Sequence, residues 1–145
     1  MKRLNILLML ILSLTSLNLL AETTSKPFAE KKVVLQISDP NPFKQTLVLN
    51  VANNLIKHYG PDKVDVEIVA FGPGLRLLMD GNANQKRISG LSNNGVRFAA
   101  CKNTIAAFSK NLGHTPKLVK QATPVSAGVV RIIDLTSEGY TLVKP

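Results

Sequence analysis

The sequence predicts an α/β fold in which a mainly parallel sheet carries helices on both of its faces. Short apolar runs rich in Val and Ile alternate with longer runs whose apolar residues recur every three or four positions. The short runs are typical of buried strands, and the longer ones of amphipathic helices. Glycine and proline residues separate the runs, as they do at the ends of both kinds of element. This alternation in a chain of 145 residues favours one parallel-sheet domain.

The N-terminal region does not fit this pattern and predicts a secretory signal peptide over residues 1–21. Lys2 and Arg3 precede a leucine-rich run over residues 4–20, and Ala21 is the kind of small residue found at cleavage sites. A signal anchor that stays in the membrane is the alternative, but the Ser, Thr and Asn residues inside the run favour cleavage. We therefore expect a periplasmic or otherwise exported protein, with no stable membrane insertion after cleavage.

The charge balance makes the protein basic without predicting a nucleic-acid partner. The whole chain has a formal net charge of +9, from 18 Lys and Arg against 9 Asp and Glu. Removal of residues 1–21 takes away two basic residues and no acidic one, which leaves +7. The basic residues are scattered, aromatic residues are few, and an exported protein rarely meets nucleic acid. We interpret the charge as favouring solubility and attraction to anionic ligands or surfaces.

Two segments follow the predicted cleavage site. Residues 22–31 are polar and predict a disordered lead-in. Residues 32–145 then form a single predicted domain, which is long enough to bury a core.

The first strand and helix have the clearest predicted boundaries. Val33–Ile37 is an apolar run of strand length, and a segment of Asp, Pro and Asn residues ends it. Asn41 is suited to the N-cap of a helix and Pro42 to its first position. The helix is predicted over residues 43–59, because the apolar residues there share one face, and it ends at Gly60–Pro61.

A second strand is predicted over residues 64–71, followed by a glycine turn and a short helix over residues 75–79. The turn contains Gly72 and Gly74, with Arg76 close by, and a glycine turn between strand and helix can bind an anion. The spacing is not that of a dinucleotide-binding or phosphate-binding loop. These three residues are a candidate anion-binding turn, and an ordinary tight turn is the alternative.

The rest of the chain repeats the alternation of strands and helices. The predicted elements are a weak helix (81–95), a strand (96–100), a helix that begins after Cys101 and ends at Gly113, a strand (118–122), a helix of about three turns within 124–139, and a final strand (140–143). Parallel strands place their carboxyl ends at one edge of a sheet. Asp39, the Gly72–Gly74 turn and Cys101 should therefore lie along the same edge.

Cys101 is the single cysteine of the chain and the candidate reactive residue. It lies between a predicted strand and a predicted helix, where free backbone N–H groups and the helix dipole favour an anion such as a thiolate. We expect its sulfur to be exposed at the strand-end cleft and its pKa to be lowered. The alternative is a buried cysteine that packs as a small hydrophobic residue. A lone cysteine cannot form an intramolecular disulfide in an oxidising compartment.

The residues after Cys101 are candidates for support of the thiol. Lys102 would add positive charge, and Asn103 and Thr104 would donate hydrogen bonds from side chain or backbone. Capping of the helix N-terminus requires the same residue types and is the alternative for Asn103 and Thr104. One cysteine and two isolated histidines show no metal-ligand spacing, so no metal or other cofactor is predicted. A classical hydrolase is not favoured, because no serine lies in a nucleophile-elbow motif.

Several segments, taken in order, resemble the DsrE/DsrF-like family. They are Phe71–Gly72–Pro73–Gly74–Leu75, the run from Gly95 to Thr104 that contains Cys101, Gly128–Val129–Val130 and Glu138–Gly139–Tyr140. The resemblance covers residues 32–145 and is closest to an exported branch of the family. It implies a three-layer α/β/α sandwich around a mainly parallel five-stranded sheet, often assembled as dimers, trimers or hexamers. In relatives that handle sulfur, the cysteine after the third strand carries sulfane sulfur as a persulfide, and Cys101 matches that position.

The resemblance implies a sulfur-handling protein that binds or relays sulfane sulfur as a persulfide on Cys101. Its partner would be a small sulfur compound or a sulfur-carrier protein, and the protein itself would be a homo-oligomer. Relatives that relay sulfur usually work in cytoplasmic complexes, whereas this chain has a predicted export signal. The alternative function is a non-catalytic oligomeric binding or assembly module with a structural cysteine, so whether the protein is an enzyme stays open at this point.

Overall fold

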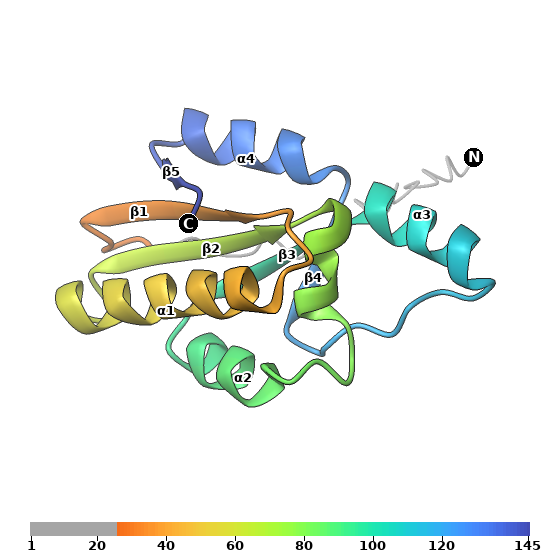
Figure 1. Ribbon diagram of the computed structural model, residues 1–145. Helices are drawn as coiled ribbons and strands as arrows, with labels where there is room; N and C mark the ends of the chain where they lie inside the picture. Colours follow the sequence, from red (N-terminus) through yellow and green to blue (C-terminus); the bar gives the residue numbers. More distant parts are fainter. Residues whose placement is uncertain (1–25) are drawn as a thin grey trace, which may run out of the picture.

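Five parallel strands form one sheet in the computed structural model, which describes residues 26–145 (Figure 1). The strands are β1 (Lys31–Ile37), β2 (Val64–Ala70), β3 (Arg97–Cys101), β4 (Ala122–Val125) and β5 (Thr141–Val143). Their order across the sheet is β4-β3-β2-β1-β5, and every neighbouring pair is parallel. The predicted signal peptide, residues 1–21, lies outside the described residues.

Helices cover both faces of the sheet and produce three layers. The helical elements are α1 (Pro42–Tyr59), the 3₁₀ helix η1 (Gly72–Leu78), α2 (Gln85–Asn93), α3 (Lys102–Leu112) and α4 (Gly128–Ser137). α1 and α2 lie on one face and α4 on the other, while α3 extends beyond the carboxyl end of β3 (Figure 1). The predicted fold class, an α/β/α sandwich around a five-stranded parallel sheet, is confirmed.

Local chemistry sets the boundaries of α1. The Asn41 side chain accepts a hydrogen bond from the Phe43 N–H at 2.9 Å, and Pro42 takes the first position. At the other end, Gly60 has a φ of 89°, and its N–H donates to the Ile56 carbonyl at 2.9 Å. Glycine adopts this positive φ at low cost because it has no Cβ, and it therefore ends the helix here. The predicted cap residues are confirmed.

The apolar clusters on the two faces of the sheet differ in size, and one face also carries buried charged residues. β2 is buried along its whole length because it lies in the middle of the sheet with helices on both sides. On one face, the side chains of the sheet pack with side chains of α1, η1 and α2 in a large apolar core. The face beneath α4 has a small apolar cluster, which consists of Val34, Val69, Ala99, Ile132, Leu135 and Tyr140. Asp65 and Glu67 are also buried, and they alternate along β2 with the residues of the large core.

The predicted fourth strand, residues 118–122, is wrong. The strand is Ala122–Val125, and it pairs with β3 at the edge of the sheet. Leu118 instead forms an isolated antiparallel bridge with Met79, and the Val119 N–H donates to the Leu78 carbonyl at 2.9 Å. The apolar residues of the prediction therefore anchor the connection before β4. Pro124 is tolerated within the strand because an edge strand needs hydrogen-bond donors on one side only.

The structure describes residues 26–31 of the segment predicted to be a disordered lead-in, residues 22–31. The Lys26 backbone N–H donates to Asp65 at 3.0 Å, and its ammonium donates to the carbonyls of Val64, Asn94 and Pro61. Lys31 already belongs to β1. These long-range contacts cannot be predicted from the polar composition of the segment. Within residues 26–145, no helix is both long enough and apolar enough to cross a membrane.

Candidate functional site

Cys101 lies at the junction that the sequence predicted. It is the last residue of β3 and the N-cap residue of α3, with an extended backbone conformation (φ −67°, ψ 117°). Its exposed fraction is 5%. The expectation of an exposed sulfur is therefore wrong. β3 lies between β2 and β4, and the N-terminus of α4 approaches the thiol from the following βα unit, so neighbours on several sides cover this position.

Hydrogen-bond donors surround the buried sulfur. Burial acts to raise the pKa of the Cys101 thiol, while hydrogen bonds from the Thr104 side chain and from the backbones of Thr104, Gly128 and Asn103 lower it. The effect of the hydrogen bonds is larger than the effect of burial, so the pKa of Cys101 lies below the ordinary value of 9.0. The backbone donors stabilise the thiolate more than the neutral thiol, because a charged acceptor makes the stronger hydrogen bond. The predicted direction of the pKa shift is confirmed.

Two helix N-termini contribute these backbone donors. Asn103 and Thr104 belong to the first turn of α3, and Gly128 is the first residue of α4. The first N–H groups of a helix have no partner within the helix and carry the positive end of its dipole. Gly128 fits here because a Cβ on it would lie 2.8 Å from the Cβ of Phe71. A larger residue would push the start of α4 away from its neighbours.

Thr104 connects the thiol to the glycine turn. Its hydroxyl oxygen accepts a hydrogen bond from the Gly72 N–H at 2.8 Å, and the side chain also bonds to the sulfur of Cys101. Since the oxygen is occupied as an acceptor, the hydroxyl hydrogen is directed to the sulfur. Of the three candidate support residues, Thr104 is the one whose side chain reaches the thiol.

Replacement of Thr104 by Val is expected to raise the pKa of Cys101 by about one to two units, because a hydrogen bond to the thiolate is lost. Alkylation rate against pH measures this pKa. Thr104→Ser keeps the hydroxyl and is the matched control, with a pKa close to wild type. Equal pKa values for Thr104→Val and wild type would contradict the assigned hydrogen bond.

The other candidate support residues contribute less than expected. The side chains of Lys102 and Asn103 are exposed, and Asn103 acts through its backbone. In the candidate anion-binding turn, the Gly72 N–H is already bound to Thr104. Gly74 is buried against the backbone of β1, and the exposed Arg76 places its guanidinium 6.0 Å from the ring centre of Phe108. The Gly72 N–H of this turn thus orients the Thr104 side chain through a hydrogen bond.

Gly128 is the site residue that sequence reasoning missed. It belongs to one of the segments on which the family resemblance rests, but the sequence pattern does not define where within residues 124–139 the helix begins. The signal that could have found it is its position after a strand and at the start of a helix. In a parallel sheet such residues gather at the carboxyl edge, beside Cys101.

A buried ionic cluster beneath α4 was also missed. Glu67 accepts hydrogen bonds from Arg131 and Arg97, and Asp65 accepts them from Arg97 and the Tyr140 hydroxyl. Burial and the bond to Asp65 raise the pKa of Tyr140 to about 12. The sequence signal was an acidic residue at alternate positions of an apolar strand. A charge buried in this way requires a partner, and the two arginines provide it.

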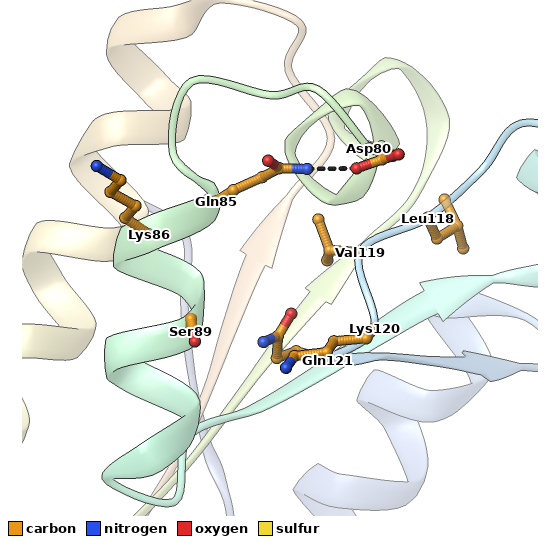
Figure 2. Close-up of a pocket in the computed structure, with 8 residues that line it drawn as sticks. All are labelled: Asp80, Gln85, Lys86, Ser89, Leu118, Val119, Lys120 and Gln121. Carbon is orange, nitrogen blue, oxygen red and sulfur yellow. Dashed lines mark hydrogen bonds between the residues drawn. The ribbon is translucent and has the colours of Figure 1, made fainter.

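A separate cleft of about 430 Å³ opens between α2 and the segment before β4. Figure 2 shows Gln85, Lys86 and Ser89 on the helix side of this cleft and residues 118–121 on the other side. Gln85 donates a hydrogen bond to Asp80 at 2.6 Å across its upper part (Figure 2). Cys101 does not line this cleft, so the cleft is not the entrance to the thiol.

Comparison with known proteins identifies the fold. No family model and no curated protein sequence matches the chain. A protein of unknown function from Methanobacterium thermoautotrophicum, MTH1491, superposes with a TM-score of 0.71 at 28% identity, over 79% of this chain and 99% of that one. The chain has the DsrE/TusD-like fold.

A second neighbour agrees with this assignment. The YchN protein from E. coli superposes with a TM-score of 0.59 at 14% identity, again over 79% of this chain and 99% of that one. At this identity the likeness concerns the fold alone. In both cases the matched region covers nearly the whole neighbour.

Proposed function

We propose that this chain belongs to the DsrE/DsrF-like family and handles sulfur, with Cys101 receiving, holding and passing on a sulfane sulfur atom. The observation that carries the proposal is the convergence of hydrogen-bond donors from α3 and α4 on one thiol, which lowers its pKa. A lowered pKa increases the fraction of thiolate near neutral pH, and the thiolate is the nucleophile in sulfur chemistry. The DsrE/TusD-like fold supports the same interpretation.

The reaction needs no cofactor. The Cys101 thiolate attacks a sulfane sulfur of a polysulfide, a new S–S bond forms, and the old S–S bond breaks with its electron pair on the leaving sulfide chain. The product is a persulfide anion on Cys101. An acceptor thiolate, on a small thiol or a carrier protein, then attacks the terminal sulfur and releases the Cys101 thiolate. The Thr104 hydroxyl and the Gly128 N–H stabilise the anion at the start and at the end of this cycle.

The small exposed fraction of Cys101 favours a sulfur donor that is a narrow, unbranched chain. A polysulfide chain is one atom wide, whereas a protein persulfide must bring a whole surface to the sulfur. The test is whether Cys101 gains sulfur from polysulfide, measured as the intact mass of the protein with and without reductant.

The second candidate function is a non-catalytic oligomeric binding or assembly module with a structural cysteine. The observation that favours it is the burial of Cys101, which has an exposed fraction of 5%. Native-state alkylation separates the two functions, because a structural thiol of this kind reacts only when the protein unfolds.

Export is a part of the proposal that rests on the sequence alone. We expect the protein isolated from its host to begin near Glu22, since residues 1–21 have the charge and apolar pattern of a signal peptide. N-terminal sequencing of the secreted or periplasmic fraction measures this. Intact Met1 in the membrane fraction would identify a retained anchor instead.

Homo-oligomer formation is supported by the outer surface of α4. Three large apolar side chains of this helix are exposed: Val129 (53%), Val130 (48%) and Ile133 (56%). Their spacing places them on one side of the helix. Light scattering on the mature protein at micromolar concentration is expected to give a multiple of the chain mass, and Ile133→Lys to reduce it. A monomer mass for wild type would contradict the proposal.

A further inference from the structure

α4 packs on the sheet over a small apolar cluster and is paired with it through Arg131 and Glu67. Among residues 26–145 it is the helix that covers its face of the sheet, and the apolar cluster beneath it is small. Arg131 bonds to Glu67 through two nitrogens, with Nε to Oε1 and Nη2 to Oε2 both at 2.7 Å. Such two-point pairing fixes orientation as well as distance.

The Glu67 side chain is fixed in position by burial and by a second arginine. Glu67 belongs to the central strand β2, and its side chain is 1% exposed. Arg97 on β3 donates to the same carboxylate at 3.0 Å and also pairs with Asp65. The Glu67 carboxylate is therefore held by Arg97 as well as by Arg131.

Arg131 lies three residues after Gly128, which is about one helical turn. The ion pair therefore acts on the same turn of α4 that directs the Gly128 N–H to the sulfur of Cys101. We propose that the Glu67–Arg131 ion pair is the positioning element that holds this turn of α4 against Cys101, an inference that rests on the proposed role of the thiol. Neither residue touches the sulfur in this arrangement. They act through the helix that connects them to it.

The test is the pH dependence of Cys101 alkylation in Arg131→Met. Loss of the ion pair releases the first turn of α4, weakens the Gly128 hydrogen bond and is expected to raise the thiol pKa by about one unit. Tyr140→Phe is the matched control, because it removes two hydrogen bonds from the same buried cluster without changing Glu67 or Arg131. It should lower the melting temperature and leave the thiol pKa at the wild-type value.

Arg131→Met also removes a positive charge, and Arg131→Lys separates that change from the change in position. The charged and titratable groups around Arg131 include Glu67, Arg97 and Glu138, with Asp65 and Tyr140 bonded to Arg97. The exposed Lys102 follows Cys101 in the chain. Lysine keeps the positive charge but cannot reproduce two parallel bonds to one carboxylate. Positioning predicts a raised pKa in Arg131→Lys as well, smaller than in Arg131→Met. This variant also decides the question if Arg131→Met does not fold.

The outcomes are distinct. A raised pKa in both arginine variants, with Tyr140→Phe unchanged, supports the positioning role. A wild-type pKa in a folded Arg131→Lys, or an equal shift in Tyr140→Phe, overturns it. An ordinary pKa in the wild-type protein would instead overturn the proposed function of Cys101, and that result is seen before any variant is made.

Discussion

Treatment of the mature protein with polysulfide is expected to add sulfur at Cys101, and each atom raises the intact mass by about 32 Da. Cys101→Ser should abolish the addition completely, because no other cysteine exists in the chain. Reductant should remove the added mass from wild type, since a persulfide S–S bond is reducible. Mass spectrometry of the intact protein measures all three results.

The control for this experiment is the folded state of Cys101→Ser. Serine is close to cysteine in size, so circular dichroism should show an unchanged fold with only a modest loss of stability. If wild type gains no sulfur and resists alkylation while folded, the thiol is structural. The binding or assembly module is then the better interpretation of the site.

Cys101→Ser also tests how ionisation of the thiol affects the free energy of unfolding. The folded-state pKa of Cys101 is below its ordinary value of 9.0. The thiolate therefore contributes stability that is fully present above that value and is lost as pH falls through the lowered pKa. Wild type should gain stability relative to Cys101→Ser as pH rises across this interval, and unfolding in urea at several pH values measures the difference.

Gly74→Ala is expected to destabilise the protein by about 3 kcal/mol or more. A Cβ at this position would lie 2.4 Å from the Ile37 carbonyl oxygen and 2.7 Å from the Ser38 Cα. These are backbone atoms at the end of β1, so η1 would have to move away from the sheet. Urea unfolding monitored by circular dichroism measures the loss.

Gly90→Ala is the matched control for Gly74→Ala. Gly90 lies within α2, and a Cβ there has no atom within 4 Å. Alanine is the better helix former, so this substitution should stabilise the protein by about 0.5–1 kcal/mol. A loss of stability in Gly74→Ala no larger than about 1 kcal/mol would mean that η1 shifts easily.

The sequence by itself determined the fold class, the limits of α1 and the position of Cys101. Each of these follows from local chemistry. The Asn41 side chain caps the first turn of the helix, and the Pro42 ring fixes a helical φ at its first position. Gly60 ends the helix because it can adopt a positive φ. The alternation of strands and helices then allows few sheet arrangements, and the helix after β3 places donors beside Cys101 whatever the rest of the chain does.

Only the tertiary structure decided the burial of Cys101, the part played by Gly128 and the pairing of Glu67 with Arg131. All three depend on residues far apart in the sequence. β4 must take its place beside β3 before α4 can bring Gly128 to the sulfur. Glu67 and Arg131 are 64 positions apart, and nothing in the sequence around either residue identifies the other as its partner. The fold makes them partners because burial of one charge on the sheet requires the other above it.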